Sequence, residues 1–182
     1  MALLRAPSRP LGDDTIVLRS PRAGDVAALV RYGDDPDVAE TMWVPIPSPC
    51  SRAVAAERLD DFNRGWEQEN RFGPALIIAD AQSDELIGVL FLQMREQDSI
   101  ELSYGVAPAS RNRGVATAAV TLASSWCLQE LGAARVELRI GRDNLASQRV
   151  ATKSGFTSTG TVHSHVAATG KTYEDLLFLL PR

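Results

Sequence analysis

The spacing of hydrophobic positions changes along this chain and divides it into two kinds of segment. Thr15–Ser20 (TIVLRS) is short and β-branched, which predicts a first strand. Apolar residues then recur at helical spacing, and Ser20 before Pro21 predicts the start of a helix. A second serine, Ser51, predicts the cap of a longer helix that reaches about Asn70. The N-terminal part is therefore expected to be one strand followed by helices.

Beyond that point the pattern becomes that of strands. Two apolar runs, FGPALIIAD and LIGVLFLQM, flank the turn-like AQSDE and predict a β-hairpin. Ser99–Val106 predicts a third strand, because apolar and polar residues alternate along it. A helix over Thr117–Leu131, a strand over Arg135–Ile140, a short helix capped by Asn144 and two final strands complete the order. This order predicts a mixed α/β fold with a mostly antiparallel sheet.

Length and composition narrow the class of protein. The 182 residues suit a single domain, with residues 1–13 as a loose lead, and 45% of them are hydrophobic, as in an ordinary globular protein. The formal net charge of -4 gives no overall basic field, which argues against nucleic acid as the main partner. The first apolar stretch is too short for a signal peptide and no stretch has transmembrane length, so we expect a cytoplasmic protein with no membrane partner.

The two cysteines, Cys50 and Cys127, lie far apart in the sequence. The plain interpretation is an apolar filler in a helix at Cys127 and a loop thiol at Cys50. The alternative is a disulfide or a nucleophile, and no neighbouring His-based motif supports it.

The stretch GVAPASRNRGVATAAV, from Gly105 to Val120, is the first candidate for chemistry. It lies between a predicted strand and a predicted helix, and the first N–H groups of a helix have no internal partner. Glycine at Gly114 would let an anion approach them closely, and Arg111 and Arg113 add donors suited to phosphate. Taken alone, these residues leave two interpretations open: an ordinary strand-to-helix turn or a pyrophosphate cradle.

Two other phosphate motifs fail. Gly170-Lys171-Thr172 would belong to a P-loop only with glycine at the position of His165, and the segment precedes a strand rather than a helix. No G-x-G-x-x-G occurs, so the dinucleotide fingerprint is missing.

The pattern R-x-x-G-x-A at Arg111, Gly114 and Ala116, followed by NLAS…KSGF from Asn144 to Phe156, resembles the signature of the GCN5-related N-acetyltransferase (GNAT) superfamily. Residues 14–182 as a whole resemble the branch that acetylates the N-termini of ribosomal proteins. The resemblance implies a sheet of about six to seven strands flanked by about four helices. It also implies that strand Ser99–Val106 splays from Arg135–Ile140 to form a slot for acetyl-coenzyme A (acetyl-CoA).

The same resemblance assigns the residues that would hold this co-substrate. The pantetheine arm would pair with the backbone of Tyr104, Gly105 and Val106. The pyrophosphate would be held by the amides of Arg113, Gly114, Val115, Ala116 and Thr117, with the Arg111 and Arg113 side chains nearby. Asn144 and Ser147 would lie beside the thioester.

An amine attacks a thioester only when it is neutral, so a base is useful near neutral pH. Glu101 precedes the proposed slot and is the candidate base; the alternative is a plain solvated strand residue. The N–H of Val106 could stabilise the oxyanion, and the hydroxyl of Ser147 could assist the leaving thiolate. The alternative for Ser147 is only to begin a helix.

Three residues are candidates for contact with the acceptor amine, namely Trp43, His163 and His165. Packing is the alternative for Trp43, and an exposed hairpin is the alternative for the two histidines. We expect no metal, because no Cys, Asp or Glu with ligand spacing accompanies the histidine pair.

The sequence therefore predicts an N-acetyltransferase that uses acetyl-CoA and a primary amine, either a peptide N-terminus or a small molecule. The alternative is an acyl-CoA sensor with the same fold and no turnover. A homodimer is left open.

Overall fold

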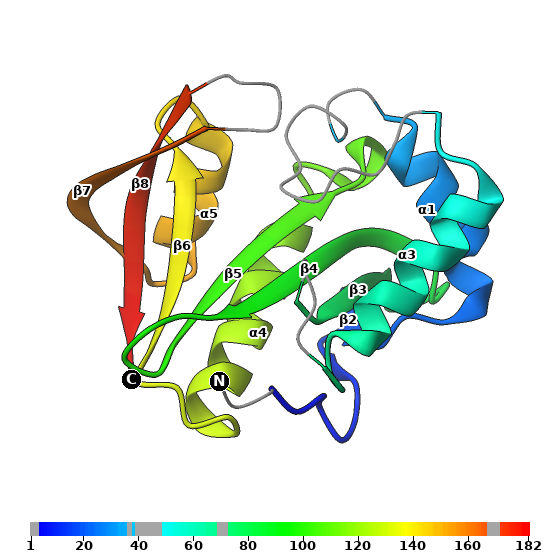
Figure 1. Ribbon diagram of the computed structural model, residues 1–182, viewed down its shortest axis with the longest axis horizontal. Coiled ribbons are helices and arrows are strands. Elements are labelled where there is room, and N and C mark those ends of the chain that lie inside the picture. The colour runs from blue at the N-terminus through cyan, green and yellow to red at the C-terminus, as the bar shows by residue number, and fades with distance from the viewer. Residues whose placement is uncertain (1–3, 36–37, 39–48, 69–72, 167–171) are drawn as a thin grey trace.

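Eight strands form one continuous sheet across the part of the chain that the computed structural model describes, residues 4–35, 38, 49–68, 73–166 and 172–182 (Figure 1). The strands lie in the order β1-β2-β3-β4-β5-β6-β8-β7. Their bounds are β1 Leu11–Gly12, β2 Ile16–Arg19, β3 Ala75–Asp80, β4 Leu86–Met94, β5 Ser99–Val106, β6 Arg135–Gly141, β7 Thr157–Val166 and β8 Thr172–Pro181.

Helices and connecting segments make up the rest of the described chain. The bounds of the helices are α1 Val26–Gly33, α3 Arg52–Arg64, α4 Val115–Gln129 and α5 Leu145–Lys153. Short 3₁₀ turns, Ala23–Asp25 and Pro108–Ser110, precede α1 and follow β5. Within the described ranges, none of the helices combines the length and hydropathy needed to cross a membrane.

All neighbouring strands pair antiparallel except β5 and β6, which are parallel. A parallel pair needs a crossover connection, and here the connection contains α4. The predicted mixed and mostly antiparallel fold is therefore confirmed. The additional strand is β1, where Leu11 and Gly12 pair with β2 inside the segment expected to be a loose lead.

Alternate residues of the central strands enter two hydrophobic clusters on opposite faces of the sheet. In β3, Leu76 and Ile78 join the cluster that includes α4, whereas Ile77 and Ala79 join the cluster that includes α1 and α3. Figure 1 shows the same division, with α1 and α3 on the near face and α4 and α5 behind the sheet. The two front helices lie over β2, β3 and β4, and no helix of the described residues lies over the near face of β5, β6 and β8.

Two helix boundaries in the N-terminal part differ from the sequence predictions. Ser20 is not a cap: Arg22 takes that position, and its N–H donates to the carboxylate of Asp25 at 2.8 Å. Ser51 does cap α3, with its hydroxyl accepting from an N–H of the first turn, but α3 ends at Arg64 instead of near Asn70. Just beyond this end, Gly65 lies so close to the backbone of Gly73 and Pro74 that a Cβ would be 2.5 Å from it.

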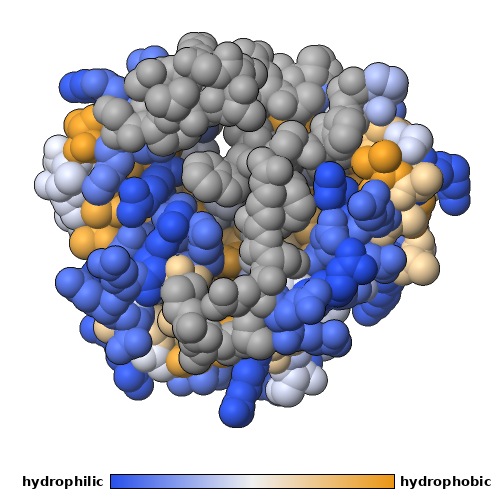
Figure 2. Space-filling model, in the orientation of Figure 1, coloured by the Kyte–Doolittle hydropathy of each residue, from blue (hydrophilic) through white to orange (hydrophobic). Residues whose placement is uncertain are grey.

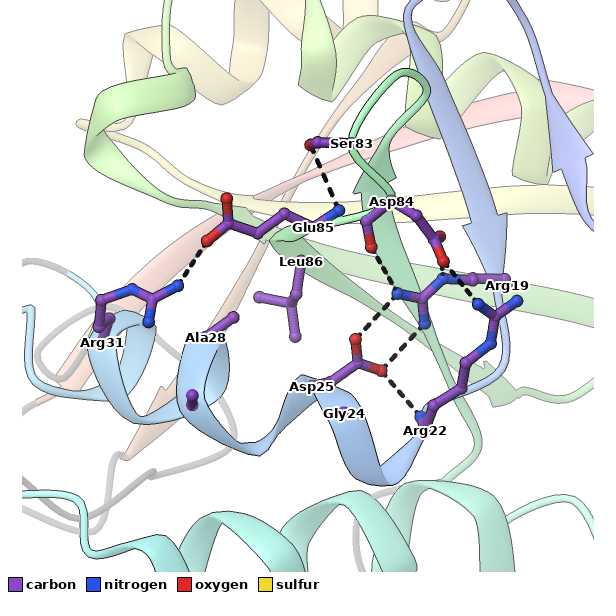
Figure 3. Close-up of a pocket in the computed structure, with 11 residues that line it drawn as sticks. Arg19, Arg22, Gly24, Asp25, Ala28, Arg31, Ser83, Asp84, Glu85 and Leu86 are labelled. Atoms are coloured by element: carbon purple, nitrogen blue, oxygen red, sulfur yellow. Dashed lines mark hydrogen bonds and ion pairs between the residues drawn. The ribbon is translucent and has the colours of Figure 1, made fainter.

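A buried ion pair fixes α1 to the turn between β3 and β4 (Figure 3). The Arg19 guanidinium donates to both carboxylate oxygens of Asp25, at 2.8 and 2.9 Å, and to Asp84 at 2.6 Å. Arg22 pairs with the second oxygen of Asp84. These residues line a cavity of about 360 Å³. Because the Arg19 N–H groups are already used, we interpret this cavity as part of the scaffold and place the candidate site elsewhere.

Candidate functional site

The ladder between β5 and β6 is short and ends where the two strands diverge (Figure 1). It ends with the pair Glu101 and Glu137, the third register pair of the ladder. β5 continues to Val106 and remains paired with β4 along its other edge. The predicted divergence of the two strands is thus confirmed, and it leaves one edge of β5 without a strand partner among the described residues.

The register with β4 decides which backbone groups point to this free edge. The N–H of Ala107 donates to the Ile87 carbonyl oxygen at 2.8 Å. Hydrogen-bonded pairs alternate along an antiparallel ladder, so the backbone groups of Gly105 also face β4. Tyr104 and Val106 therefore turn their backbone groups toward the free edge. Of the three residues predicted to hold pantetheine, Tyr104 and Val106 direct their backbone groups to the free edge. The backbone groups of Gly105 are hydrogen-bonded to β4.

The free edge leads directly to the N-terminus of α4. Gly114 is the N-cap residue, with a φ of 82°, and no side chain caps the helix. A Cβ built at Gly114 would meet no heavy atom within 4 Å, so the space before the helix is open. α4 begins at Val115, two residues before the predicted Thr117. The first-turn amides, which include those of Ala116 and Thr117, are the predicted pyrophosphate donors, and their position fits that role.

The two predicted phosphate arginines differ in their surroundings. Arg111 donates from Nε to the carbonyl oxygen of Val106 at 3.1 Å, and its Nη2 lies 3.8 Å from Oδ1 of Asp35 beyond α1. It therefore connects the end of β5 to the end of α1. Arg113 is exposed, and its charge helps to lower the pKa of Asp80 after the larger effect of backbone N–H donors in the same turn. Arg113 is the more accessible donor for an anion.

Glu101, the predicted base, is buried on the near face of the sheet at the point of divergence. Its Oε2 accepts a hydrogen bond from the Nε of Arg95 at 2.8 Å and lies 2.9 Å from the Nε of Arg139. Beside it, the carboxylate of Glu137 is bound by Arg135 at 3.0 Å and by a serine hydroxyl. The expectation of a merely solvated strand residue does not fit this burial.

Asn144 and Ser147 stand at the start of α5, as predicted. The Asn144 side chain accepts the N–H of Ser147 at 3.0 Å and so acts as the helix cap. The Ser147 hydroxyl lies close enough to the Tyr104 hydroxyl to favour the tyrosinate, but burial is the larger effect and raises the pKa of Tyr104. No hydrogen bond of acceptable geometry joins the two groups, and the Tyr104 oxygen is enclosed without a partner among the described residues. The two side chains therefore face each other from the diverging halves of the sheet.

The predicted acceptor residues are only partly described. Trp43 lies outside the described residues. His163 and His165 both lie in β7, opposite Asp175 and Tyr173 of β8. The His163 side chain is half-buried, and its Nε2 has no hydrogen-bond partner in the described part of the chain. The structure does not describe the side chain of His165.

The two thiols have no place in this site. Cys127 lies in α4 within one hydrophobic cluster and Cys50 lies within the other. Both thiols are free, so the alternative of a disulfide between them is wrong. Burial raises the pKa of the Cys127 thiol to about 12 and also raises that of Cys50. Both thiols are therefore protonated and poor nucleophiles at neutral pH.

Sequence reasoning missed the two arginines that hold Glu101. Arg95 follows the end of β4, and Arg139 lies two residues after Glu137 in β6. The alternation in RVELRI places Glu137 and Arg139 on one face of their strand, which was a usable signal. The register that brings this face beside Glu101 is a long-range property that the local pattern does not contain.

Comparison with known proteins adds the identity of the fold. A family model described as an acetyltransferase (GNAT) domain matches residues 15–157. The uncharacterized N-acetyltransferase p20 of Bacillus licheniformis is 23% identical over 170 residues, which cover 92% of this chain and 93% of that protein.

Two solved structures illustrate the range of relatives. The ribosomal-protein-S5-alanine acetyltransferase of Vibrio fischeri has a TM-score of 0.77 at 15% identity, covering 96% of this chain and 97% of that one. The microcin C7 self immunity acetyltransferase MccE, in complex with acetyl-CoA and AMP, has a TM-score of 0.74 at 16% identity, covering 93% and 94%. At these identities the likeness establishes the fold and leaves the acceptor open.

Proposed function

This chain belongs to the GNAT acetyltransferase family, and on that premise we propose that it transfers the acetyl group of acetyl-CoA directly to a primary amine. The acceptor is either a peptide N-terminus or a small-molecule amine. One relative's structure contains acetyl-CoA, which supports the choice of donor.

The observation that carries this proposal is the continuous path from the free edge of β5 to the start of α4. The edge offers the backbone of Tyr104 and the N–H of Val106, whose carbonyl oxygen already accepts from Arg111, and the path ends at the N-terminus of α4, where no side chain caps the helix. A pantetheine arm needs amide partners and a pyrophosphate needs convergent N–H donors, so both parts of the co-substrate fit these residues. Residues Arg113 to Thr117 would hold the pyrophosphate.

Acetyl-CoA supplies an acetyl group already activated as a thioester. The chain's own residues then have three tasks. Glu101 uses Oε1, which no described residue occupies, to take the proton of the attacking amine. The N–H of Val106 donates toward the acetyl oxygen, and the hydroxyl of Ser147 donates to the departing sulfur. Ser147 is supported for this task by its position across the divergence from Tyr104.

Binding of the donor is the first test. Acetyl-CoA at about 100 times its dissociation constant should stabilise the folded state by roughly 2.7 kcal/mol. For a chain of this size that corresponds to a rise in melting temperature of about 5–10 °C. An unchanged melting temperature at saturating acetyl-CoA would contradict the proposal.

A matched pair of glycine variants locates the site. Gly114 and Gly132 lie near opposite ends of α4, both have positive φ, and a Cβ at either meets nothing within 4 Å. Gly114→Glu and Gly132→Glu thus bring the same strain and charge. We expect only Gly114→Glu to abolish stabilisation by acetyl-CoA, because its carboxylate faces the phosphates. Equal loss in both variants would contradict this placement.

Turnover separates the enzyme from the alternative, an acyl-CoA sensor. The enzyme releases free CoA when an amine panel is added, and the thiol can be followed with a chromogenic reagent. A sensor would keep the thermal stabilisation and release no thiol above the rate of spontaneous hydrolysis.

A further inference from the structure

The carboxylate of Glu101 is held from one side only. Arg95 and Arg139 both contact Oε2 through their Nε atoms, at 2.8 and 2.9 Å. Oε1 has no hydrogen-bond partner among the described residues, and it does not belong to the enclosed polar atoms without partners. One carboxylate oxygen therefore serves the scaffold and the other remains available to an ammonium group.

The arginines beside it also have unused donors. Each binds Glu101 through Nε, and within the described chain the terminal nitrogens of Arg95 and Arg139 have no partner. About a third of each side chain is exposed, 30% for Arg95 and 32% for Arg139. Arg135, by contrast, uses Nε for Glu137 and both terminal nitrogens for Gln97. The free donors of this cluster thus belong to the two arginines around Glu101.

The charges around the ammonium site are nearly balanced. Three arginines, at 95, 135 and 139, face two carboxylates at 101 and 137, and Asp175 lies on the same face beside Gly141. An anion would therefore be bound by the free terminal nitrogens of Arg95 and Arg139 and not by a net positive charge. A guanidinium with free terminal N–H groups is suited to a carboxylate, which it can bind with two parallel hydrogen bonds.

This cluster lies where an acceptor would have to approach the thioester. Glu101 is the last residue of β5 paired with β6, and Arg139 lies two residues beyond the last paired residue of β6. Both occupy the near face, where no helix of the described residues covers β5, β6 and β8 (Figure 1). Figure 2 shows hydrophilic residues gathered over this part of the same face.

We propose that the acceptor is a small amine with a carboxylate within a few bonds of the amino group, such as an α-amino acid. This inference rests on the proposed acetyl transfer. Oε1 of Glu101 receives the ammonium, and the terminal nitrogens of Arg139 and Arg95 receive the carboxylate. Because these donors surround a single carboxylate, the positive and negative groups of the acceptor must lie only a few ångströms apart.

Other amines fit this arrangement less well. A polyamine would place a second cation near two guanidinium groups, which is unfavourable at short range. A peptide N-terminus has a neutral amide where an amino acid has its carboxylate, so the terminal nitrogens would gain no charged partner.

The test compares each amino acid with its own amide, which lacks the charge next to the amine. The pKa of the amine is also lower in the amide, so the two kcat/KM values are compared across the pH range. With the full-length protein and saturating acetyl-CoA, we expect kcat/KM to be at least tenfold higher for the acid in the preferred pair. Amides that react as well as the acids, or better, would overturn the proposal.

Two arginine positions make the test specific. Arg139→Gln should reduce the acid-to-amide ratio of kcat/KM about tenfold or more, and Arg139→Lys should restore part of it because the charge is kept. Arg135→Gln, whose donors are already used within the protein, should leave the ratio unchanged. A ratio that is the same in Arg139→Gln and in the unaltered protein would overturn the proposal.

Direct binding keeps this inference separate from the proposed function. Calorimetry with CoA present should detect the amino acid and not its amide, and Arg139→Gln should weaken binding of the amino acid about tenfold. If no amine is acetylated but this pattern holds, acetyl transfer fails and the binding inference stands. If amides are acetylated as readily as acids, acetyl transfer stands and the binding inference fails.

Discussion

Glu101 combines two tasks that usually fall to different residues. Its Oε2 holds Arg95 and Arg139 in place, and its Oε1 points to no protein partner in the described chain. The arginines orient the carboxylate, so the free oxygen is presented in one fixed position. If Glu101 is the base, as we propose, little reorganisation is needed when the amine arrives.

Glu101→Gln tests the role of this residue as the base. The amide cannot take a proton, so the amine must lose its proton to water before it attacks. We expect kcat to fall about 100-fold near pH 7. The deficit should shrink as the pH approaches the amine's own pKa, which is about 8 for a peptide N-terminus and higher for a free amino acid. A pH–rate profile of the variant parallel to that of the unaltered protein would contradict the assignment.

The neighbouring Glu137 provides the matched control. It is also buried, lies opposite Glu101 in the ladder and binds an arginine, but its Oε1 is shared by Arg135 and Ser99. Glu137→Gln should lower the melting temperature, because it disturbs a buried pair, and should keep the pH dependence of the rate. Acetyl-CoA should still stabilise both variants.

At the scale of elements, the buried pair of Arg19 and Asp25 decides how α1 sits on the sheet. The two side chains are 4% and 6% exposed, and their bidentate contact joins the end of β2 to the turn before α1 (Figure 3). Asp25→Asn removes one charge and leaves Arg19 with the partly exposed Asp84 as its remaining acidic partner in the described chain.

We expect Asp25→Asn to destabilise the fold by about 3–5 kcal/mol, because it leaves a buried charge poorly compensated. That corresponds to a fall in melting temperature of about 6–20 °C for a chain of this size. The control is Arg31→Ala, which removes an exposed pair with Glu85 and should cost at most about 1 kcal/mol. Equal losses of stability in the two variants would show that the buried pair contributes no more to the free energy of unfolding than the exposed pair.

Local patterns in the sequence predicted most elements and some of their ends. The alternation in Ser99–Val106 predicted the bounds of β5, and the caps Ser51 and Asn144 are present. The failures have structural causes. Arg22 replaces Ser20 as a cap because Asp25 turns back to bind both its N–H and Arg19. These side-chain contacts span only a few residues, but the hydrophobic pattern does not encode them.

At the scale of the whole molecule, stability in acid depends partly on the β3–β4 turn. The pKa of Asp84 is lowered, chiefly by its hydrogen bond from Arg19, and the pKa of Asp80 is lowered, chiefly by the backbone N–H of Ser83. Both groups therefore stabilise the folded state above their unfolded pKa, about 4, and this stabilisation is lost as the pH falls through the folded values.

We accordingly expect the melting temperature to fall as the pH drops below about 4. Asp84→Asn should melt lower than the unaltered protein at pH 7 and should show a shallower decline in acid. Asp143→Asn, an exposed control, should follow the unaltered protein throughout. Thermal scans between about pH 7 and about pH 2.5 check this, and identical slopes for all three proteins would exclude a role for Asp84.

The candidate site was predictable to the extent that it is built locally. Arg111, Gly114 and Ala116 form a short motif whose chemistry depends on a strand-to-helix turn, and the turn is present. Gly105 shows the limit, since its register with β4 determines where its backbone groups point. Arg95 and Arg139 reach Glu101 only through strand pairing, so no local pattern could place them there.

A donor site made of backbone places few demands on side chains. Tyr104 and Val106 would serve the co-substrate through main-chain atoms, so most substitutions along that edge would leave its hydrogen bonds intact. The proposed acceptor site beside it consists of side chains, so one substitution at Arg139 would alter it. Proteins with this arrangement could therefore keep acetyl-CoA as donor at low sequence identity, such as the 23% between this chain and one relative. A few substitutions would be enough to change the acceptor.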